Sequence, residues 1–328
     1  RKALSLAGIE NISVVAEQEN PDGDFPTCPF PNPEIKQALE KGLALCKKVN
    51  ADLLLATDPD CDRVGIAVKQ NDDYILTTGN EVGVLLTNYL LKARKENNTL
   101  PKNPIIVKTI VSTPLIYPIA KKYGAQVIDV LTGFKFIGEQ IRILEEKGEE
   151  ERYVFGFEES YGYLSGTYVR DKDAVVASLL ICEMAAYYKK QGKTLIDVLN
   201  EIYSEFGIYY CQQDNFYFEG SAGMDKMNKI ISSLQANPPK QIAGFSVKTF
   251  IDYAKSIKTT IATNAQEIVT LPKSDVLVFN LENGCDIIIR PSGTEPKIKA
   301  YYTAIAETLD NAQKIHNAMA QSMKEIMQ

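Results

Sequence analysis

The stretch PIIVKTIVSTPLIYPIAKKYGAQVIDV (residues 104–130) decides the fold class, because it passes from one strand through a helix into another strand. Its apolar run at 105–111 predicts the first strand, 115–123 a helix, and 125–130 the second strand. The alternation continues with three further predicted elements: a helix at 136–147, a strand at 153–157 and a helix at 174–190. Strands alternating with helices form right-handed crossover units, so this region predicts a largely parallel sheet.

The residues before this stretch predict another α/β unit. The elements expected there are a strand at 12–17, a helix at 35–49, strands at 51–57 and 64–69, and a helix at 82–95. Asn80 is the expected N-cap of the last helix. Between the first strand and the first helix, the prolines of residues 20–34 (NPDGDFPTCPFPNPE) exclude regular structure. An irregular loop of this length is more often functional than idle.

The order of elements changes near Gly207, which marks a third region. A strand at 209–218, a helix at 224–235, several strands and a final helix at 309–326 predict a smaller α+β domain with an antiparallel sheet. The fold class expected is therefore α/β, with two mixed-sheet α/β domains followed by this α+β domain. The polar stretch KENNTLPKNP separates the first two, and the predicted domains are 1–98, 104–206 and 207–328.

Composition excludes several classes of protein. The chain has 328 residues, with 36 Lys and Arg against 42 Asp and Glu, and this net charge of -6 argues against nucleic acid as a partner. The absence of a run of about eighteen apolar residues argues against a membrane span. Six cysteines without a CxxC pair predict free thiols and a cytoplasmic location. The single histidine, His316, lies in a polar helical stretch, where we expect a solvated surface position rather than catalysis.

Three aspartates at every second position of TDPDCDR form an acidic loop between two predicted strands. Asp58, Asp60 and Asp62 repel one another strongly, so either some of them are protonated or a cation joins them. Oxygen ligands of this kind favour Mg²⁺. A calcium loop of the EF-hand type would need Gly in place of Arg63 and Glu in place of Lys69. The alternative is an exposed acidic turn that binds nothing.

Acidic and hydroxyl side chains follow the strand predicted at 153–157. Glu158, Glu159 and Ser160 lie between glycines, where such groups suit hydrogen bonds to the vicinal hydroxyls of a sugar. Two carboxylates also suggest a glycosidase, but neighbours at one strand end do not flank a glycosidic bond from opposite sides. A solvated charged loop is the other alternative.

The segment LTGFKFIGEQ places Thr132, Gly133 and Lys135 at a strand-to-helix turn. The backbone N–H groups of such a turn and the lysine ammonium would meet polar atoms of a ligand. A simple helix entry explains the same residues about equally well.

The segment DIIIRPSGTE (286–295) runs an apolar strand into a turn suited to phosphate. Arg290 offers a forked cation, and Ser292, Gly293 and Thr294 offer hydroxyls and closely spaced N–H groups. Gly293 would let the turn bend toward an anion at little steric cost. The sequence thus predicts a phosphate-binding loop here.

Four segments in this order, TDPDCDRVG, TGFKF, GFEESYG and RPSGTEPK, resemble those of the α-D-phosphohexomutases, the phosphoglucomutase and phosphomannomutase family. The resemblance covers the whole chain. It implies interconversion of hexose 1-phosphate and hexose 6-phosphate through a hexose 1,6-bisphosphate, with glucose 1,6-bisphosphate as intermediate or activator and Mg²⁺ as cofactor. It also implies hexose phosphates as the partners of the protein.

The resemblance assigns roles to individual residues. The metal ligands would be Asp58, Asp60 and Asp62. The catalytic residues would be Arg63, beside the reacting phosphate, and Lys172, as the acid/base group. The substrate-binding residues would be Thr132, Gly133 and Lys135 at the turn that helps to select the sugar, Glu158 and Ser160 on its hydroxyls, and Arg290, Ser292, Gly293 and Thr294 on the phosphate that is not transferred.

One family motif has no counterpart in these residues. The phosphoserine loop of the family has the form TASHNP, and no serine here precedes His-Asn-Pro. The chain therefore resembles domains two to four of a longer mutase, beginning inside domain two, and we expect no sustained turnover from it alone. The alternatives are a non-catalytic sugar-phosphate-binding protein and a metal-dependent phosphatase.

Overall fold

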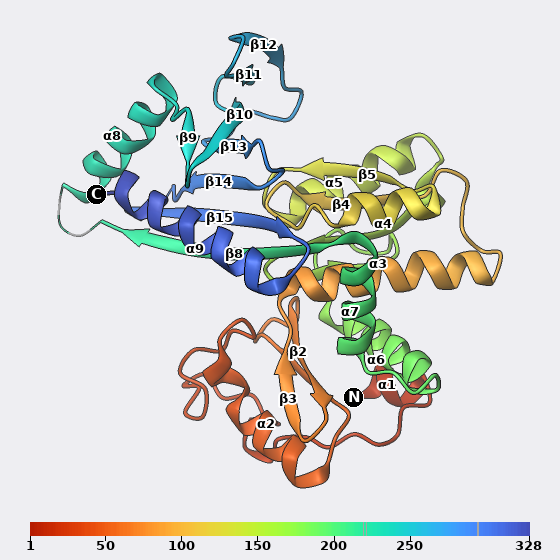
Figure 1. The fold of residues 1–328 in the computed structure, drawn as a ribbon. Coiled ribbons are helices and arrows are strands. Elements are labelled where there is room, and N and C mark those ends of the chain that lie inside the picture. The colour runs from red at the N-terminus through yellow and green to blue at the C-terminus, as the bar shows by residue number, and fades with distance from the viewer. Residues whose placement is uncertain (219, 221, 294) are drawn as a thin grey trace. The chain divides into compact units, whose positions relative to one another are not determined.

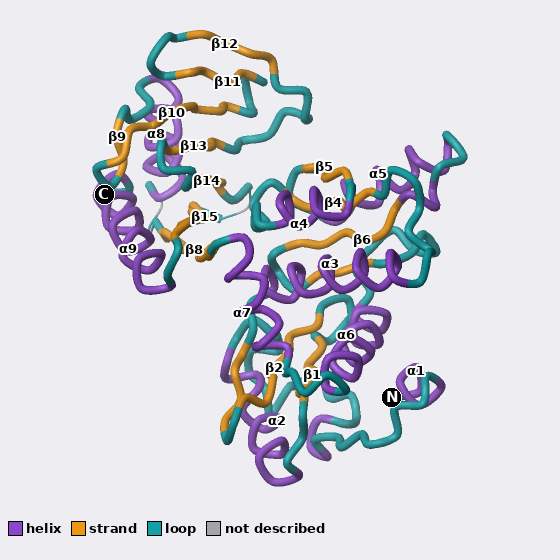
Figure 2. The backbone as a smooth tube through the Cα atoms, turned by 45° about the vertical axis from the view of Figure 1, so that its right-hand side comes forward, coloured by secondary structure: helices purple, strands orange, loops and turns teal. Residues whose placement is uncertain are grey.

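A computed structural model of the protein describes residues 1–218, 220, 222–293 and 295–328. The chain divides into two compact units, Arg1–Ile202 and Tyr203–Gln328, and the division falls within α7 (Leu195–Phe206). Figures 1 and 2 show the elements of each unit. The finer division into three domains stays a prediction. In the described residues, no helix is both long enough and apolar enough to cross a membrane.

One of the two sheets in the first unit is small and antiparallel, and it carries the acidic loop. Its order is β1-β2-β3, and the strands are β1 (Leu53–Thr57), β2 (Val64–Gln70) and β3 (Asp73–Leu76). Helix α2 (Lys36–Val49) packs on β1 through a small core of Leu39, Cys46, Leu54 and Ala67. Because Thr57 pairs with Val64, residues 58–63 are held as a tight loop between the two strand ends.

The strand predicted at 12–17 is wrong. After the short helix α1 (Lys2–Leu6), these residues are irregular and end in the 3₁₀ helix η1 (Ala16–Gln18). Local turns take up the backbone groups, because Ile12 N–H donates to the carbonyl of Glu10 and Gln18 N–H to that of Val15. Alternating apolar residues favour a strand only where a partner strand accepts their N–H groups.

The second sheet of this unit confirms the α/β prediction. Its order is β5-β4-β6-β7, with strands β4 (Ile105–Thr109), β5 (Gln126–Val130), β6 (Tyr153–Glu158) and β7 (Gly162–Leu164). Strand β4 is parallel to β5 and β6, whereas β7 turns back antiparallel to β6. The helices that pack on it are α3 (Gly79–Glu96), α4 (Ile116–Tyr123) and α5 (Phe134–Glu146); η2 (Glu150–Arg152) precedes β6 and α6 (Ala174–Lys189) follows β7.

Helix α3 starts at Gly79, three residues before the predicted start at residue 82. Thr78, not Asn80, is the N-cap, and it forms a capping box with Glu81. The Asn80 side chain instead accepts the N–H of Thr113 at 2.8 Å. Two glycines let the helix approach the sheet, since a Cβ on Gly79 would lie 2.0 Å from the Glu159 carbonyl oxygen and one on Gly83 would lie 2.3 Å from the Phe157 ring. Helix α3 therefore packs closely against the end of β6, which carries Glu158.

The second unit contains helices and an antiparallel sheet, as predicted. Its order is β12-β11-β10-β13-β14-β15-β8, with β9 paired to β10. The strands are β8 (Ile208–Tyr217), β9 (Gln241–Ile242), β10 (Phe245–Asp252), β11 (Ile257–Thr260), β12 (Ala265–Ile268), β13 (Leu277–Leu281), β14 (Asp286–Pro291) and β15 (Lys297–Ala306). Residues of α8 (Gly223–Ala236) and α9 (Leu309–Ile326) share one hydrophobic core with it, and Figure 1 shows α9 along β15 and β8.

His316 does not lie on the open surface as predicted. It is half-buried on α9, with its ring edge-on to the rings of Tyr210 and Tyr302 at 5.5 and 5.3 Å.

Gly83→Ala tests the close packing of α3. Alanine normally stabilises a helix relative to glycine by about 1 kcal/mol. Here the added methyl group would overlap the Phe157 ring, so we expect a loss of about 1–3 kcal/mol in the free energy of unfolding. Chemical denaturation measures the change, with Gly23→Ala as control because a Cβ there meets nothing within 4 Å. A Gly83→Ala protein as stable as the wild type would contradict this packing.

Candidate active site

The acidic loop is closed by one of its own carboxylates. Asp58 Oδ1 accepts the N–H groups of Asp62 and Arg63 at 3.1 and 3.0 Å. Cys61 turns the chain with a φ of 59°, and its N–H donates to the Asp58 carbonyl. The loop thereby brings one carboxylate oxygen from each of Asp58, Asp60 and Asp62 within 4.8 Å of the others.

The three carboxylates fit a small divalent cation. Burial raises the pKa of Asp58, and the charges of Asp62 and Asp60 raise it further, against the N–H groups that it accepts. Asp62 Oδ1 is buried and has no hydrogen-bond partner within the described part of the chain. Repelling carboxylates and an unsatisfied oxygen are relieved by a cation, and the all-oxygen donor set suits Mg²⁺.

Arg63 lies among three carboxylates. Its Nε is 3.8 Å from Asp58 Oδ2 and 3.7 Å from Asp62 Oδ1. Its Nη1 donates to Glu34 Oε1 at 3.5 Å. Glu34 ends the proline-rich segment, and the sequence analysis did not identify it as a site residue. Only the length and irregularity of that segment pointed to a function.

Lys172 joins the acidic loop to the second sheet. Its Nζ forms ion pairs of 2.9 Å with both Asp62 and Asp171, and its side chain is only 12% exposed. The ammonium lies 5.5 Å from the centre of the Phe134 ring, and the stem packs against Gly162. Burial lowers the pKa of Lys172, but the two carboxylates outweigh burial, so the pKa lies above its ordinary value. The group is therefore a cation at neutral pH.

Backbone hydrogen bonds fix the acidic loop to the turn between β6 and β7. Arg63 and Gly162 form an antiparallel bridge, and Val64 N–H donates to the Tyr161 carbonyl at 3.1 Å. On the other side, Ala174 N–H at the start of α6 donates to the Cys61 carbonyl at 3.2 Å. These hydrogen bonds therefore hold the acidic loop and the turn after Glu158 in a fixed position relative to each other.

Glu158 ends β6 and Gly133 follows β5, and these two strands flank β4 in the same direction. Both residues therefore lie at the carboxyl edge of the sheet, where ligands bind in parallel sheets. Gly133 N–H donates to Glu158 Oε1 at 2.8 Å. Its φ of 116° is one that residues with a side chain rarely adopt. Burial raises the pKa of Glu158, against this N–H and the positive charges of Lys172 and Arg63. Both cations thus partly offset the effect of burial on this carboxylate.

The other predicted sugar contacts differ in burial. Thr132 and Ser160 are half-buried, whereas Lys135 is exposed on the first turn of α5. The Lys135 ammonium lies 5.0 Å from the ring centre of its neighbour Phe136. Glu159, beside Glu158, accepts a hydrogen bond from Thr109 at 3.2 Å, so it braces the turn against the end of β4.

The predicted phosphate loop belongs to the second unit. Arg290 is the last residue but one of β14 and pairs with Lys299 of β15, so their side chains share one face of the sheet. Ser292 N–H donates to the Lys297 carbonyl at 2.8 Å, so it closes the turn, whereas we expected it to face an anion. Gly293 has no positive φ, so its turn does not depend on the freedom of glycine. Thr294 lies outside the described residues.

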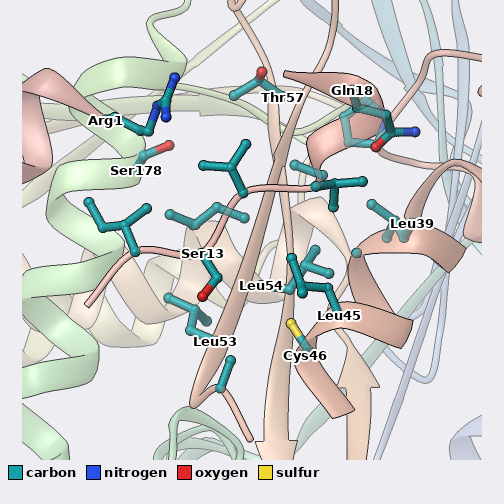
Figure 3. A pocket seen from close by; sticks show the side chains of 18 of the residues that line it. Arg1, Ser13, Gln18, Leu39, Leu45, Cys46, Leu53, Leu54, Thr57 and Ser178 are labelled. Atoms are coloured by element: carbon teal, nitrogen blue, oxygen red, sulfur yellow. The ribbon is translucent and has the colours of Figure 1, made fainter. Parts of the chain in front are cut away.

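A cavity of about 1640 Å³ lies beside β1 in the first unit. Figure 3 shows aliphatic side chains of α2 and β1 lining it: Leu39, Leu45, Leu53 and Leu54. Irregular residues of the N-terminal segment, Ile12 to Val15, line it as well. Asp58, Pro59 and Cys61 of the acidic loop also border this cavity, but Arg63, Lys172 and Glu158 do not, so most of the site predicted from the sequence lies outside it.

Glu158→Gln tests the cost of burying this carboxylate. Because burial raises its pKa above 4.5, the folded protein holds a proton here more tightly than the unfolded chain. The protonated Glu158 carboxyl therefore contributes its full stabilisation below pH 4.5, and this contribution is lost as the pH rises through the folded-state pKa. We expect Glu158→Gln to be more stable than the wild type at pH 7, because glutamine still accepts from Gly133 without a buried charge.

Chemical denaturation between pH 4.5 and 8 measures this difference, which should shrink as the pH falls. Glu139→Gln on the same unit is the control, because Glu139 is an exposed residue of α5. A Glu158→Gln protein that is less stable than the wild type at pH 7 would contradict the burial cost.

Two family descriptions match the first unit and a few residues beyond it. Residues 1–71 match phosphoglucomutase/phosphomannomutase α/β/α domain II, and residues 78–206 match α/β/α domain III. A protein described as a probable phosphomannomutase from Haemophilus influenzae is 38% identical over 99% of this chain and 61% of its own length. A phosphoglucomutase from Staphylococcus aureus is 38% identical over 96% of this chain and 56% of its own length. The chain thus spans little more than half the length of these relatives.

Solved structures share the fold. The open form of parafusin, a phosphoglucomutase from Paramecium, has a TM-score of 0.60 at 20% identity, covering 90% of this chain and 50% of that one. A phosphoglucomutase/phosphomannomutase family protein from Burkholderia thailandensis has a TM-score of 0.60 at 16% identity, covering 93% and 53%. The two matched domains and the 38% identical relatives show that the chain belongs to the phosphoglucomutase/phosphomannomutase family.

Proposed function

We propose that these residues carry the metal-binding and sugar-binding parts of a phosphohexomutase that interconverts hexose 1-phosphate and hexose 6-phosphate through a hexose 1,6-bisphosphate. The observation that carries the proposal is the ion pair between Lys172 and Asp62. It joins a candidate metal loop to the turn that holds Glu158, so cation, acid/base group and sugar contacts meet within one unit. Family membership supports the same activity.

The residues of the first unit would divide the work on a phosphoryl group. Asp58, Asp60 and Asp62 would hold Mg²⁺, which when bound neutralises charge on the transferring phosphoryl group. The Arg63 guanidinium would add a second positive charge at the same place. The family resemblance assigns the acid/base role to Lys172, whose Nζ would donate a proton to a sugar oxygen and take it back in the reverse direction. Asp62 and Asp171 keep this group protonated until it meets the substrate.

The remaining residues would position the sugar. Glu158 Oε1 receives Gly133 N–H, so Oε2 would accept from a sugar hydroxyl. Ser160, Thr132 and Lys135 would supply further polar contacts at the same strand ends. In the second unit, Arg290, Ser292, Gly293 and Thr294 would bind the distant phosphate. Arg290 has no ion pair in the part of the chain that the structure describes. Contacts remote from the reacting phosphate lower the barrier by orienting the substrate.

Binding of glucose 1,6-bisphosphate in the presence of Mg²⁺ tests the site as a whole. We expect calorimetric titration to detect binding, and Arg290→Ala to weaken it at least tenfold, because a charge-assisted contact contributes about 1.5–3 kcal/mol. Lys258→Ala is the control, since this lysine pairs with Glu267 on another strand of the same unit. Equal binding by the wild type and Arg290→Ala would contradict the assignment of the phosphate loop.

Turnover by residues 1–328 alone tests whether catalysis needs a phosphoryl carrier that these residues lack. The family resemblance assigns the phosphoryl carrier to a serine loop that these residues do not contain. We therefore expect no sustained conversion of glucose 1-phosphate to glucose 6-phosphate in a coupled assay. Turnover above that of an Arg290→Ala control would contradict this expectation. A protein that binds the sugar phosphate without turnover fits both this proposal and the alternative, a non-catalytic sugar-phosphate-binding protein.

The proposal includes a cytoplasmic location. All six cysteines are free thiols in the structure, which supports a reducing compartment.

A further inference from the structure

The proline-rich segment ends in a turn that is docked against the acidic loop. Asn32 Oδ1 accepts the N–H of Glu34 at 3.0 Å, and the Asn32 carbonyl accepts the N–H of Ile35. Pro33 packs directly on Gly65 of β2, where an added Cβ would lie 2.9 Å from both the carbonyl oxygen and the Cβ of Pro33. These contacts fix the backbone of Glu34 beside the strand that follows Arg63.

The Arg63 guanidinium depends on Glu34 for its hydrogen bonding. The Nη1 contact to Glu34 is its one side-chain hydrogen bond among the described residues. Its Nε is buried and has no hydrogen-bond partner, although Asp58 and Asp62 lie 3.8 and 3.7 Å away. The guanidinium is thus held just beyond hydrogen-bonding distance of two carboxylates that attract it.

We propose that Glu34 is a positioning residue that draws Arg63 away from Asp58 and Asp62 and so keeps the two oxygens that face Arg63, Asp58 Oδ2 and Asp62 Oδ1, open to a divalent cation. The inference rests on the proposed metal site. An arginine within a few ångströms of a carboxylate closes to a charge-assisted hydrogen bond when nothing opposes it. Without the charge of Glu34, Arg63 would move onto the aspartates and compete with the cation for the same oxygens.

Two other roles for Glu34 give different results. If Glu34 only docks the proline-rich segment, its substitution lowers stability and leaves cation affinity unchanged. If its charge attracts the cation directly, the loss of affinity does not depend on Arg63. The proposed role requires that the effect of Glu34 disappear when the Arg63 charge is removed.

A double-mutant cycle on Mg²⁺ binding tests the proposal. Calorimetric titration with Mg²⁺ alone is carried out on the full chain as wild type, Glu34→Gln, Arg63→Met and the double variant. We expect Glu34→Gln to weaken Mg²⁺ binding about threefold to tenfold, a coupling typical of residues in contact. Arg63→Met keeps the apolar stem and should tighten binding, and adding Glu34→Gln to it should change nothing further.

Glu17→Gln is the matched control, because Glu17 precedes the same segment and pairs only with the surface lysine Lys41 among the described residues. Its Mg²⁺ affinity should equal that of the wild type. An effect of Glu34→Gln that persists at full size beside Arg63→Met, or no effect in either background, would overturn the inference while leaving the metal site intact. Absence of Mg²⁺ binding by the wild type would overturn the metal site and the inference together.

Discussion

The pairing of Arg63 with Gly162 is the constraint on which the candidate site depends. The acidic loop and the Glu158 turn belong to different sheets, and this bridge with the adjacent bond from Val64 to Tyr161 ties them together. Gly162 also leaves room for the Lys172 side chain, because a Cβ at this position would lie 2.2 Å from Lys172 Cδ. The glycine therefore admits the lysine that contacts Asp62. One short stretch of backbone thus fixes the relative positions of the residues proposed as metal ligands, acid/base group and sugar contacts.

The clustered and buried charges of the candidate site lower the stability of the folded protein. Asp58, Asp60 and Asp62 lie close together, and Glu158 is a buried carboxylate whose only hydrogen-bond donor is Gly133 within the described residues. Arg63 and Lys172 balance part of this negative charge, but they leave Asp62 Oδ1 and Arg63 Nε without hydrogen bonds. Buried polar atoms without partners destabilise a protein by about 1–3 kcal/mol each. A cation and a phosphorylated ligand would satisfy the groups that the fold alone leaves unsatisfied.

The sequence predicted the elements whose patterns are local. Alternating strands and helices between 104 and 206 indicated the parallel sheet, and the acidic loop followed from three aspartates at every second position. Local patterns failed where tertiary contacts decide. Apolar alternation at 12–17 found no partner strand, the short strand β3 and helix α7 were not anticipated, and Asn80 was preferred to Thr78 as the cap.

In the candidate site, too, local sequence patterns indicated some residues, whereas tertiary contacts decide the others. Residue types identified Asp58, Glu158 and Arg290, but Glu34 is 29 positions away from Arg63 along the chain, so no spacing rule connects them. The N–H of Ser292 was expected to face a ligand, yet it closes its own turn. Which N–H groups are free is a property of the folded loop, and composition does not determine it.

The most direct measurement of the central claim is paramagnetic broadening by Mn²⁺ in amide NMR spectra of the chain, with Mg²⁺ as the diamagnetic reference. If the acidic loop holds the metal and is tied to the Glu158 turn, Mn²⁺ will broaden the amide signals of Tyr161, Gly162 and Lys172 together with those of residues 58–63. Broadening confined to other parts of the chain, or broadening of residues 58–63 without Tyr161 and Gly162, would contradict the account.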